Sequence, residues 1–520
     1  MSVIDLARMD SAWSSADANI CVIGAGIAGL VLAYQLSRGG SQVLLLESGD
    51  SQSDVEAESL NEIDNVNGRW TGALRSRCRG IGGTSQLWGG RTIPIAVDEG
   101  KPWPNTDLSG WPFPLTDIER YNKDVEAILR IDDSSYEAEL YPEHDSGDAD
   151  FRLRWAKWPR FANCNLGRRL RQSVIEHPGV TIWKNATVTG FTSDENGRIT
   201  SVTAEHQSGR QLEVSARQFV LAAGAIESTR LLLFLERQRG AADPESVLGH
   251  HFQDHINLKA ATLVRHDARA ANTVFGYRFL HSIRRSMHLE LTSQAQAECG
   301  VGSAFAYVSM DLEGSALRTF KSIGRNLQKG KIELGQLAGL SRHAGLVGQS
   351  LAWRYGRHRL YVPETVPFNV EICVEQAPHW DNRITLSERR DRFGVPLARV
   401  DWAPRPGDEV TLRTAVEKLG KSWVQRGWDN IASLGWIDAV ADRQSSLTDY
   451  STDYHHPSGT TPMGTNRKTS VTDANLTCHG VPNLNVLSAS VFPRAGSANP
   501  TFTLMRMALR LGDHLMAHRA

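Results

Sequence analysis

The stretch NICVIGAGIAGLVLAYQL, residues 19–36, decides the fold of this chain. A short apolar run is followed by a glycine turn and then by an apolar segment with helical spacing, which is typical of a buried strand, a turn and a helix. Gly24, Gly26 and Gly29 have the G-x-G-x-x-G spacing. In that spacing the glycines allow a tight turn, close approach of the backbone to a pyrophosphate, and close contact between helix and strand.

The next stretch, SQVLLLESGD (residues 41–50), predicts a second strand that ends at Glu47. Glu47 follows Gly29 by 18 residues and is placed to accept hydrogen bonds from a ribose. The two stretches together predict a dinucleotide-binding βαβ unit, but they do not distinguish NAD from FAD. Because the sequence has no second G-x-G-x-x-G, we expect one dinucleotide and no separate NAD(P)H domain.

Length and charge limit the class of protein. A chain of 520 residues is too long for a single core, which predicts at least two domains. The formal net charge of −1 argues against a general nucleic-acid binder, and no apolar run approaches the roughly 20 residues of a membrane helix. The polar first 19 residues lack the layout of a signal peptide. We therefore expect a cytoplasmic protein whose first 17 residues form a loosely ordered tail.

The cysteines predict neither a zinc site nor a disulfide framework, because none belongs to a C-x-x-C pair, and no bound metal is expected. They are scattered as Cys21, Cys78, Cys164, Cys299, Cys373 and Cys478.

Two further segments are rich in small residues. RGIGGTSQLWGGR, residues 79–91, contains five glycines, which lets the backbone approach a flat or charged ligand, although a plain surface loop has the same composition. ARQFVLAAGAIESTRLLLFL, residues 216–235, predicts a strand, a turn and a helix. Ala222, Ala223 and Gly224 at that turn permit either close approach to a cofactor or only tight packing of the strand on the helix.

The C-terminal part carries two candidate chemical groups. VPNLNVLSASVFPRAGSANPTFTLMRMALRLGDHL, residues 481–515, predicts a strand over residues 485–490, a loop, and a helix with Pro500 in its first turn. Asn499 stands where an N-cap would be; the alternative is that this helix start points at a ligand and stabilises negative charge there. In DYHHPSGTTPMGT, residues 453–465, His455 and His456 stand side by side before a tight turn.

Taken together, these segments resemble the glucose–methanol–choline (GMC) family of FAD-dependent oxidoreductases. The matching pieces follow the family's order between residues 19 and 515: VIGAGIAGLVLAYQL with VLLLESG, GIGGTSQLWGG, FVLAAGAIESTRLLL, LGHHFQDH, HHPSGTTPMGT and GVPNLNVLSASVFPRAGSANPTFTLMRMALRL. GGTSQLWGG and SANPT are more similar to the pyranose-oxidase and bacterial sugar-dehydrogenase branch than to the glucose-oxidase branch. The resemblance implies an α/β fold, α+β overall, in which a Rossmann-like FAD-binding domain is interleaved with an antiparallel-sheet substrate domain.

The resemblance also implies catalytic residues. In the family a histidine of the H-x-x-G-T segment and an Asn or His of the later loop flank the flavin N5, and these positions are His456 and Asn499 here. His456 would take the hydroxyl proton of an alcohol while the hydride of the carbon passes to N5, and flavin reduction should rise with pH through one ionisation. Asn499 would orient the substrate oxygen. For His455 and for His255 in FQDH we favour a structural or supporting role over direct chemistry.

The resemblance also implies which positions of this sequence contact the cofactor. In pyranose oxidases a histidine of the glycine-rich loop bonds covalently to the flavin, and Leu87 occupies that place here, so we expect FAD without a covalent link. Ser488 stands where many members carry an Asp in the strand before the last helix. The residues expected to bind FAD are Gly24, Gly26, Ile27, Ala28, Gly29, Glu47, Gly83, Thr84, Trp88, Val188, Ala223, Ser488, Asn499, Pro500 and Thr501.

We expect two interleaved domains. The FAD-binding domain would comprise residues 18–100, 183–255 and 446–520, and the substrate-binding domain residues 101–182 and 256–445. In the latter, residues 368–402 alternate like antiparallel strands with DRFG as a turn, and this sheet could cover the flavin. Residues 318–360 read as a basic helical stretch, which is either a solvated face or a contact for a partner, a membrane surface or another copy.

The predicted function is oxidation of an alcohol group, CH–OH to C=O, of a sugar, glycoside or sugar-like natural product. Oxygen or another molecule would accept the electrons. The alternatives are oxidation of a non-sugar alcohol, a non-redox lyase that keeps FAD only as structure, and an electron-relay module without its own substrate. The sequence predicts no nucleic-acid partner and no membrane span, and leaves the oligomeric state open.

Overall fold

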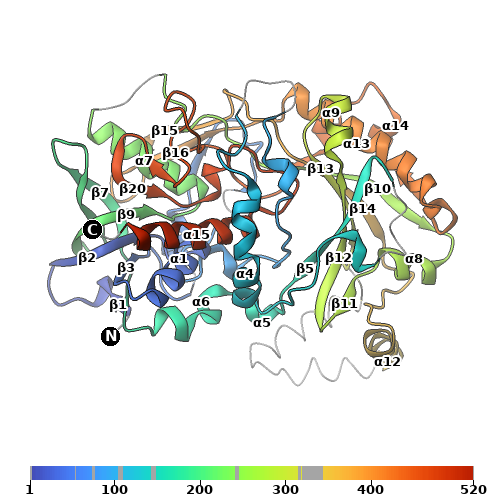
Figure 1. The fold of residues 1–520 in the computed structure, drawn as a ribbon, viewed down its shortest axis with the longest axis horizontal. Coiled ribbons are helices and arrows are strands. Elements are labelled where there is room, and N and C mark those ends of the chain that lie inside the picture. The colour runs from blue at the N-terminus through green and yellow to red at the C-terminus, as the bar shows by residue number, and fades with distance from the viewer. Residues whose placement is uncertain are drawn as a thin grey trace.

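The structure is a computed structural model that describes residues 3–52, 54–72, 76–103, 109–141, 148–240, 245–313, 315, 318 and 344–518. Within these ranges, two large sheets lie side by side along the longest axis of the molecule (Figure 1). One is mainly parallel and packs against long helices; the other is antiparallel. The α/β fold predicted from the sequence is therefore confirmed.

The mainly parallel sheet has nine strands among the described residues. They are β1 (Val3–Asp5), β2 (Trp13–Ile23), β3 (Val43–Leu46), β6 (Val180–Lys184), β7 (Thr187–Ser193), β8 (Ile199–Glu205), β9 (Gln211–Leu221), β19 (Thr477–Cys478) and β20 (Val481–Val486). The order β1-β6-β3-β2-β9-β20 is parallel throughout, while β19 pairs antiparallel to β20 and the antiparallel β7 and β8 attach through β9. Every residue of β3 is buried, as expected of a central parallel strand covered on both faces.

Three helices connect or cover this sheet: α1 (Ile27–Arg38), α7 (Ala225–Gln238) and α15 (Pro500–Ala517). The predicted βαβ unit is confirmed as β2, α1 and β3, with β2 and β3 as parallel neighbours. The first and last of these helices pack together beside the sheet, and a Cβ on Gly512 would lie 2.6 Å from the Gln35 side chain. A larger residue at position 512 would therefore force the Gln35 side chain or one of the helices to shift.

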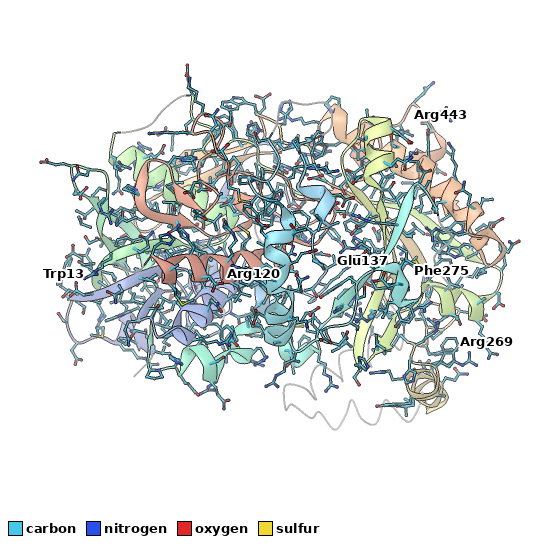
Figure 2. All side chains as sticks on the ribbon, viewed as in Figure 1. Trp13, Arg120, Glu137, Arg269, Phe275 and Arg443 are labelled. Carbon is cyan, nitrogen blue, oxygen red and sulfur yellow. The ribbon has the colours of Figure 1, made fainter. Side chains whose placement is uncertain are left out.

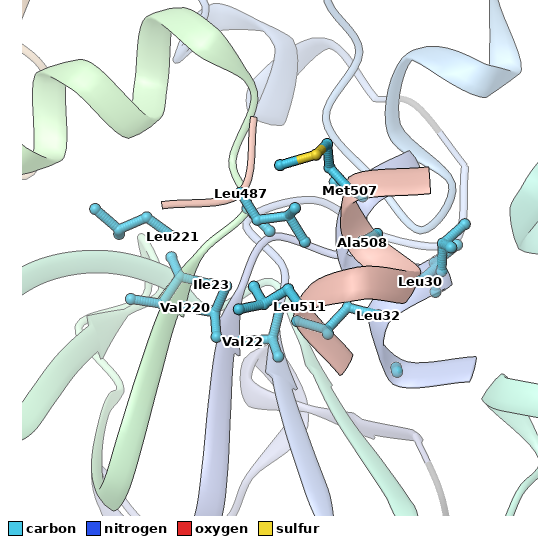
Figure 3. Close-up of a cluster of buried hydrophobic side chains, with 14 of the residues drawn as sticks. Val22, Ile23, Leu30, Leu32, Val220, Leu221, Leu487, Met507, Ala508 and Leu511 are labelled. Atoms are coloured by element: carbon cyan, nitrogen blue, oxygen red, sulfur yellow. The ribbon is translucent and has the colours of Figure 1, made fainter. Parts of the chain in front are cut away.

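Side chains from both ends of the chain form the core of this layer (Figure 3). Burial of each aliphatic side chain contributes about 1.5–3 kcal/mol, so the core binds the C-terminal helix to the N-terminal strands. The cluster includes Val22, Ile23, Leu30, Leu32, Val220, Leu221, Leu487, Met507, Ala508 and Leu511.

The start of the chain corrects one expectation. Residues 3–17 do not form a loose tail, because β1 pairs with β6 and β2 already begins at Trp13. The Asp5 carboxylate accepts a hydrogen bond from Asn185 at 2.8 Å and lies 3.1 Å from the Lys184 ammonium. The outer half of β2 alternates between exposed and half-buried side chains, and Trp13 at its tip is 51 % exposed at the rim of the molecule (Figure 2). Because much of this half-strand is polar and exposed, its sequence resembles that of a loosely ordered terminus.

The last strand also differs from its prediction. β20 covers Val481–Val486 rather than residues 485–490. Ser488 ends the extended run because its hydroxyl accepts from the Ser490 N–H and caps a short 3₁₀ helix, Ala489–Val491. The apolar run continues through this turn, so periodicity alone places the strand too late.

The antiparallel sheet has eight strands in the described part of the chain. They are β5 (Phe151–Trp158), β10 (Ile256–Arg265), β11 (Arg278–Leu280), β12 (Ile283–Leu291), β13 (Ala304–Met310), β14 (Phe368–Val374), β17 (Ala432–Trp436) and β18 (Thr452–Asp453). The order is β11-β12-β13-β14-β10-β17, with β5 paired to β12 and β18 to β10. β18 brings the segment just before His456 into this sheet.

The predicted alternating segment, residues 368–402, divides between two sheets. β14 lies inside the antiparallel sheet, whereas β15 (Arg383–Arg390) and β16 (Pro396–Asp401) pair with β4 (Ile63–Asn65) in a three-stranded sheet. DRFG is the turn of the β15–β16 hairpin, and Gly394 has a φ of 77°, which favours glycine.

A second core lies under the antiparallel sheet, against α13 (Pro406–Gln425). Phe275 from α8 (Ala268–Phe275) is buried there and stacks on Trp423 with the ring centroids 4.8 Å apart (Figure 2). The remaining α-helices are α2 (Val55–Ser59), α4 (Asn122–Leu129), α5 (Phe161–Cys164), α6 (Leu166–Arg169), α9 (Ser293–Cys299), α12 (Ala344–Leu351) and α14 (Asp438–Ala441). Across the described ranges, no helix combines the length and the apolar character needed to cross a bilayer.

The two large sheets correspond in part to the two predicted domains. Most strands of the parallel sheet come from the segments assigned to the FAD-binding domain, and most strands of the antiparallel sheet from those assigned to the substrate-binding domain. The domain boundaries themselves stay a prediction. Most of the basic stretch 318–360 lies outside the described residues; its described part contains α12.

Candidate active site

A cavity opens at the carboxyl ends of β2, β3 and β9, beside the first turns of α1, α7 and α15. Open α/β sheets bind ligands at this edge. The space between the walls measures about 1350 Å³, including the part that opens to solvent. Of the residues predicted to bind the cofactor, the walls include Gly24, Gly26, Ile27, Ala28, Glu47, Gly83, Thr84, Val188, Ala223, Ser488, Pro500 and Thr501.

The remaining predicted positions stand apart from these walls. Gly29 packs inside the βαβ unit, where a Cβ would lie 2.0 Å from the Gly24 carbonyl oxygen. Trp88 turns its Nε1 to the Cys164 carbonyl oxygen at 2.7 Å, and Leu87 is 55 % exposed. Asn499 lies behind the wall, in contact with His456.

Gly24, Gly26 and Gly83 together form a glycine cradle at the cavity wall. Close approach of other backbone atoms explains why these positions are glycines. Gly24 has a φ of 108°, and a Cβ there would lie 2.6 Å from the Ala222 carbonyl oxygen. A Cβ on Gly83 would lie 2.8 Å from the Gly26 Cα, so the glycine-rich loop and the βα turn meet backbone to backbone. Larger side chains here would occupy the cradle itself.

Glu47 is buried between these two loops. Its Oε1 accepts the N–H groups of Gly49 and Gly80 at 3.0 Å each, and its Oε2 accepts that of Ala25 at 2.9 Å. Because a carboxylate oxygen can accept two bonds, Oε2 keeps capacity for a ligand hydroxyl. The carboxylate is thus held in one orientation at the cavity wall.

Sequence reasoning missed a charged group on the same wall. Arg77, Arg79 and Glu227 all line the cavity, and the Arg79 Nη2 lies 3.1 Å from the Glu227 carboxylate. Burial alone would raise the pKa of Glu227, but Arg230 and Arg79 hold it at about 2. Burial lowers the pKa of Arg77 to about 10, and the charge of Arg79 adds to this shift. The run RSRCR, residues 75–79, is the signal that could have indicated positive charge here.

A short antiparallel ladder sets the position of His456. Gln253 and Ser458 exchange backbone hydrogen bonds of 3.0 and 2.9 Å, and Ile256 pairs with Asp453 where β10 meets β18. Between these two points the Asp254 carboxylate accepts the His456 N–H at 2.8 Å. The segment FQDH therefore holds the histidine segment from one side.

The structure brings His456 and Asn499 together. The Asn499 Nδ2 donates to the His456 Nε2 at 3.1 Å, and the other ring nitrogen of His456, Nδ1, lies 3.0 Å from the Nδ1 of His255. Asn499 occupies the N-cap position of α15, but its side chain makes no capping bond, and its Oδ1 is buried without a partner among the described residues. The amide therefore serves the histidine rather than the helix.

The protonation state of His456 follows from its surroundings. Burial lowers its pKa well below 6.5, and the nearby His255, His455 and Arg91 shift it in the same direction. The imidazole is therefore neutral over a wider pH range than an unperturbed histidine. This moves the ionisation that the sequence placed near 6.5 toward acid pH.

Two buried carboxylates hold the loop that carries Asn499. Glu375 accepts the Gly496 N–H at 2.8 Å and binds the Arg494 guanidinium at 2.6 Å, and Glu99 accepts the Ser497 N–H at 2.8 Å. Glu375 directly follows β14 of the antiparallel sheet, and Glu99 lies in a 3₁₀ helix, Val97–Gly100, so two separate elements fix the loop that leads into α15. Sequence reasoning missed both, because a buried acid looks like any surface acid in one sequence.

His455 differs from its neighbour. Its φ of 62° is left-handed, so the segment is not extended at this residue. The side chain is exposed, lines the cavity, and lies 3.2 Å from the Asp453 carboxylate. A left-handed histidine beside a ligand cavity is an uncommon conformation that its surroundings must maintain.

Comparison with known proteins identifies the family. Two family models described as GMC oxidoreductase match residues 166–257 and 378–508, and one described as FAD dependent oxidoreductase matches residues 19–61. The chain belongs to the GMC oxidoreductase family.

Relatives of this GMC chain are similar along nearly its whole length. It is 24 % identical to 6'''-hydroxyparomomycin C oxidase of Streptomyces lividus, over 96 % of this chain and 92 % of the relative. It is also 24 % identical to paromamine 6'-oxidase of Streptomyces fradiae, over 96 % and 93 %. Its fold matches that of pyridoxine 4-oxidase from Mesorbium loti with a TM-score of 0.57 at 16 % identity, covering 97 % of this chain and 100 % of that one. This GMC oxidoreductase is an FAD-dependent enzyme that acts on alcohols.

The cavity of the GMC chain fits FAD. The glycine cradle at Gly24, Gly26 and Gly83 leaves room for a pyrophosphate against backbone, and the Arg77 guanidinium supplies positive charge. The N-terminus of α15 meets the cavity at Pro500 and Thr501, where its dipole favours negative charge on a ligand.

Proposed function

We propose that this enzyme oxidises a hydroxyl group of a sugar, glycoside or sugar-like natural product to a carbonyl. In this proposal His456 is the base and Asn499 orients the substrate oxygen. The 3.1 Å contact between the Nε2 of His456, which lines the cavity, and the Nδ2 of Asn499 behind the wall carries the proposal. Bound FAD supplies the acceptor for the hydride of the carbinol carbon.

The geometry gives each side chain one task. Two atoms 3.1 Å apart can both lie within about 2.8 Å of a third atom, so one hydroxyl oxygen can contact both without separating them. That oxygen would replace the Asn499 N–H on the Nε2 lone pair: it would donate its proton to the His456 Nε2 and accept an N–H from Asn499. Because the amide cannot titrate, it keeps its role at every pH, while the neutral imidazole takes the proton.

The surroundings of His456 support a hydroxyl-rich substrate. The Tyr454 ring lies 5.0 Å from the His456 ring, and the Tyr454 hydroxyl donates to the Tyr307 hydroxyl at 2.6 Å. Aromatic faces with hydroxyl groups suit the apolar faces and polar edges of a sugar ring. The names of two relatives, 6'''-hydroxyparomomycin C oxidase and paromamine 6'-oxidase, support the same class.

The positive charge of Arg91 limits which charge the substrate can carry near its reacting carbon. Arg91 lies with its guanidinium 4.4 Å from the Tyr307 ring, and its charge contributes to the low pKa of His456. An ammonium group next to the reacting carbon would meet the same repulsion. We therefore propose that the oxidised hydroxyl belongs to an uncharged part of the substrate.

For the cofactor we propose those predicted residues that line the cavity, with Gly29 supporting them from inside the βαβ unit and with FAD bound without a covalent link. Leu87 offers no atom that can bond to the flavin, and it lies outside the cavity wall. We propose in addition that Arg77 and Arg79 compensate the charge of the pyrophosphate, since both line the cavity.

An anaerobic screen of neutral sugars, glycosides and simple alcohols tests the function. Flavin absorbance should bleach with at least one sugar-type alcohol, and His456→Ala should slow that reduction by roughly 10²–10⁴-fold. His479→Ala, which changes a half-buried histidine bonded to Ser470, is the matched control and should reduce at the parental rate. Substrate loss with the flavin still oxidised would indicate a lyase, and bleaching only by non-sugar alcohols would overturn the substrate class.

A further inference from the structure

We propose that His255 is a positioning residue that fixes the tautomer of His456, so that the Nε2 of His456 carries no hydrogen and can accept a proton. The observation is a chain of three hydrogen bonds from the Gly496 carbonyl oxygen through both imidazoles to Asn499. The inference rests on the proposed function, because it concerns the same base.

The first bond in the chain assigns the proton of His255. Its Nε2 lies 2.6 Å from the Gly496 carbonyl oxygen, which can only accept. The Nε2 of His255 must therefore carry the hydrogen. A neutral imidazole has a single N–H, so the Nδ1 of His255 is an acceptor. Burial lowers the pKa of His255 and so favours this neutral form.

The second bond transmits that assignment to His456. The two Nδ1 atoms lie 3.0 Å apart, and since that of His255 accepts, that of His456 must donate. A neutral His456 with its hydrogen on Nδ1 has a bare Nε2. The third bond agrees from the opposite end, because the Asn499 Nδ2 at 3.1 Å can only donate and so needs an acceptor at Nε2. Without His255, the contact with Asn499 alone would favour this tautomer.

The packing of His255 keeps this chain in place. The residue is 1 % exposed, precedes β10 directly, and its carbonyl oxygen accepts the Tyr454 N–H at 3.0 Å. At the other end, Glu375 accepts the Gly496 N–H at 2.8 Å. Because Gly496 and Asn499 belong to one loop, the same anchored loop sets the tautomer of the base and presents the amide beside it. A histidine that only filled space would not need its Nδ1 aimed at a second imidazole.

The test compares two substitutions of His255 in the FAD-loaded full-length enzyme. His255→Leu removes both bonds, whereas the amide of His255→Gln can donate to Gly496 and accept from His456. His479→Leu is the control. Three readouts are taken: the FAD absorbance spectrum with thermal unfolding, the rate of flavin reduction under anaerobic conditions, and the ¹⁵N NMR signals of His456, identified by their loss in His456→Ala.

We expect parental ¹⁵N signals that show a hydrogen on Nδ1 of His456 and none on Nε2. His255→Leu should shift them toward the Nε2–H form and slow flavin reduction by at least about 10-fold, within the roughly 10²–10⁴-fold that a general base contributes. The apparent substrate affinity should change little, and His255→Gln should recover most of the rate.

Two results would overturn the proposal: parental His456 with its hydrogen on Nε2, or a folded, flavin-loaded His255→Leu with unchanged signals and rate. The NMR result needs no substrate. It therefore stands even if no alcohol reduces the flavin, which would instead be a failure of the proposed function.

Discussion

Arg494 and Glu375 form an ion pair inside the protein, with the Nη2 and Oε2 atoms 2.6 Å apart and both side chains almost completely buried. The pair joins the residue after β14 to the loop that ends at Asn499. The same carboxylate also accepts the Gly496 N–H at 2.8 Å. The position of the amide beside His456 therefore depends on a contact between the antiparallel sheet and the C-terminal loop.

Glu375→Gln should destabilise the enzyme and lower the rate of flavin reduction. Removing one partner of a buried ion pair costs about 3–5 kcal/mol, because it leaves the charge of Arg494 uncompensated. Chemical unfolding with stopped-flow flavin reduction measures both effects. Glu176→Gln breaks the exposed Arg171–Glu176 pair and should change stability by less than about 1 kcal/mol. Parental stability in Glu375→Gln would show that the pair does not hold the loop.

The pH dependence of flavin reduction should be flat at and above pH 6.5 and fall only at more acid pH. The base works in its neutral form, and burial with the nearby His255, His455 and Arg91 lowers the pKa of His456 well below 6.5. Since the folded-state pKa is depressed, protonation and loss of rate require a lower pH than for a free histidine. Stopped-flow rates at saturating substrate check this, and a half-maximal rate above pH 6.5 would contradict it.

Gly29→Ala should reduce FAD occupancy and stability together. The added Cβ would lie 2.0 Å from the Gly24 carbonyl oxygen, so α1 and the βα turn must separate, at a cost of about 1–3 kcal/mol or more. Gly407→Ala in the first turn of α13 is the control, since its Cβ meets no atom within 4 Å. FAD per protein and the melting temperature measure the contrast. Full occupancy in Gly29→Ala would refute the close-packing role of this glycine.

Acid precipitation should release the flavin. If FAD is bound without a covalent link, the yellow colour moves to the supernatant, because Leu87 offers no group for attachment. Absorbance of pellet and supernatant distinguishes the outcomes. Colour that stays in the washed pellet would mean that another side chain is linked to the flavin.

Local patterns predicted the fold best where neighbouring residues determine the structure. The β2–α1–β3 unit follows from three glycines and two apolar runs, and DRFG follows from turn chemistry alone. The pairing of β1 with β6 could not be predicted, because it joins residues about 180 positions apart and a three-residue strand has no pattern of its own. β20 was placed too late because Ser488 ends the strand through a local cap within an unbroken apolar run.

The candidate site, like the fold, could be predicted from the sequence only in part. That His456 and Asn499 lie together was predicted through family resemblance, since no spacing rule brings residues 43 positions apart into contact. The supporting groups were not found. Glu375, Glu99 and Asp254 act through burial, and one sequence does not show which acids are buried. The motif FQDH by itself predicts only a supporting role for His255, because a hydrogen bond between two imidazoles depends on atoms that meet only after folding.

The parallel sheet contains strands from both ends of the chain, so its elements are synthesised far apart in time. β2, α1 and β3 are complete by residue 46, but β20 and α15, which finish the same layer, are not begun until residue 481. At about 5–20 residues per second, a ribosome needs roughly 20 to 90 seconds to cover that interval. Over that interval the cavity lacks the wall that Pro500 and Thr501 supply, so we expect flavin to bind only after α15 has been synthesised.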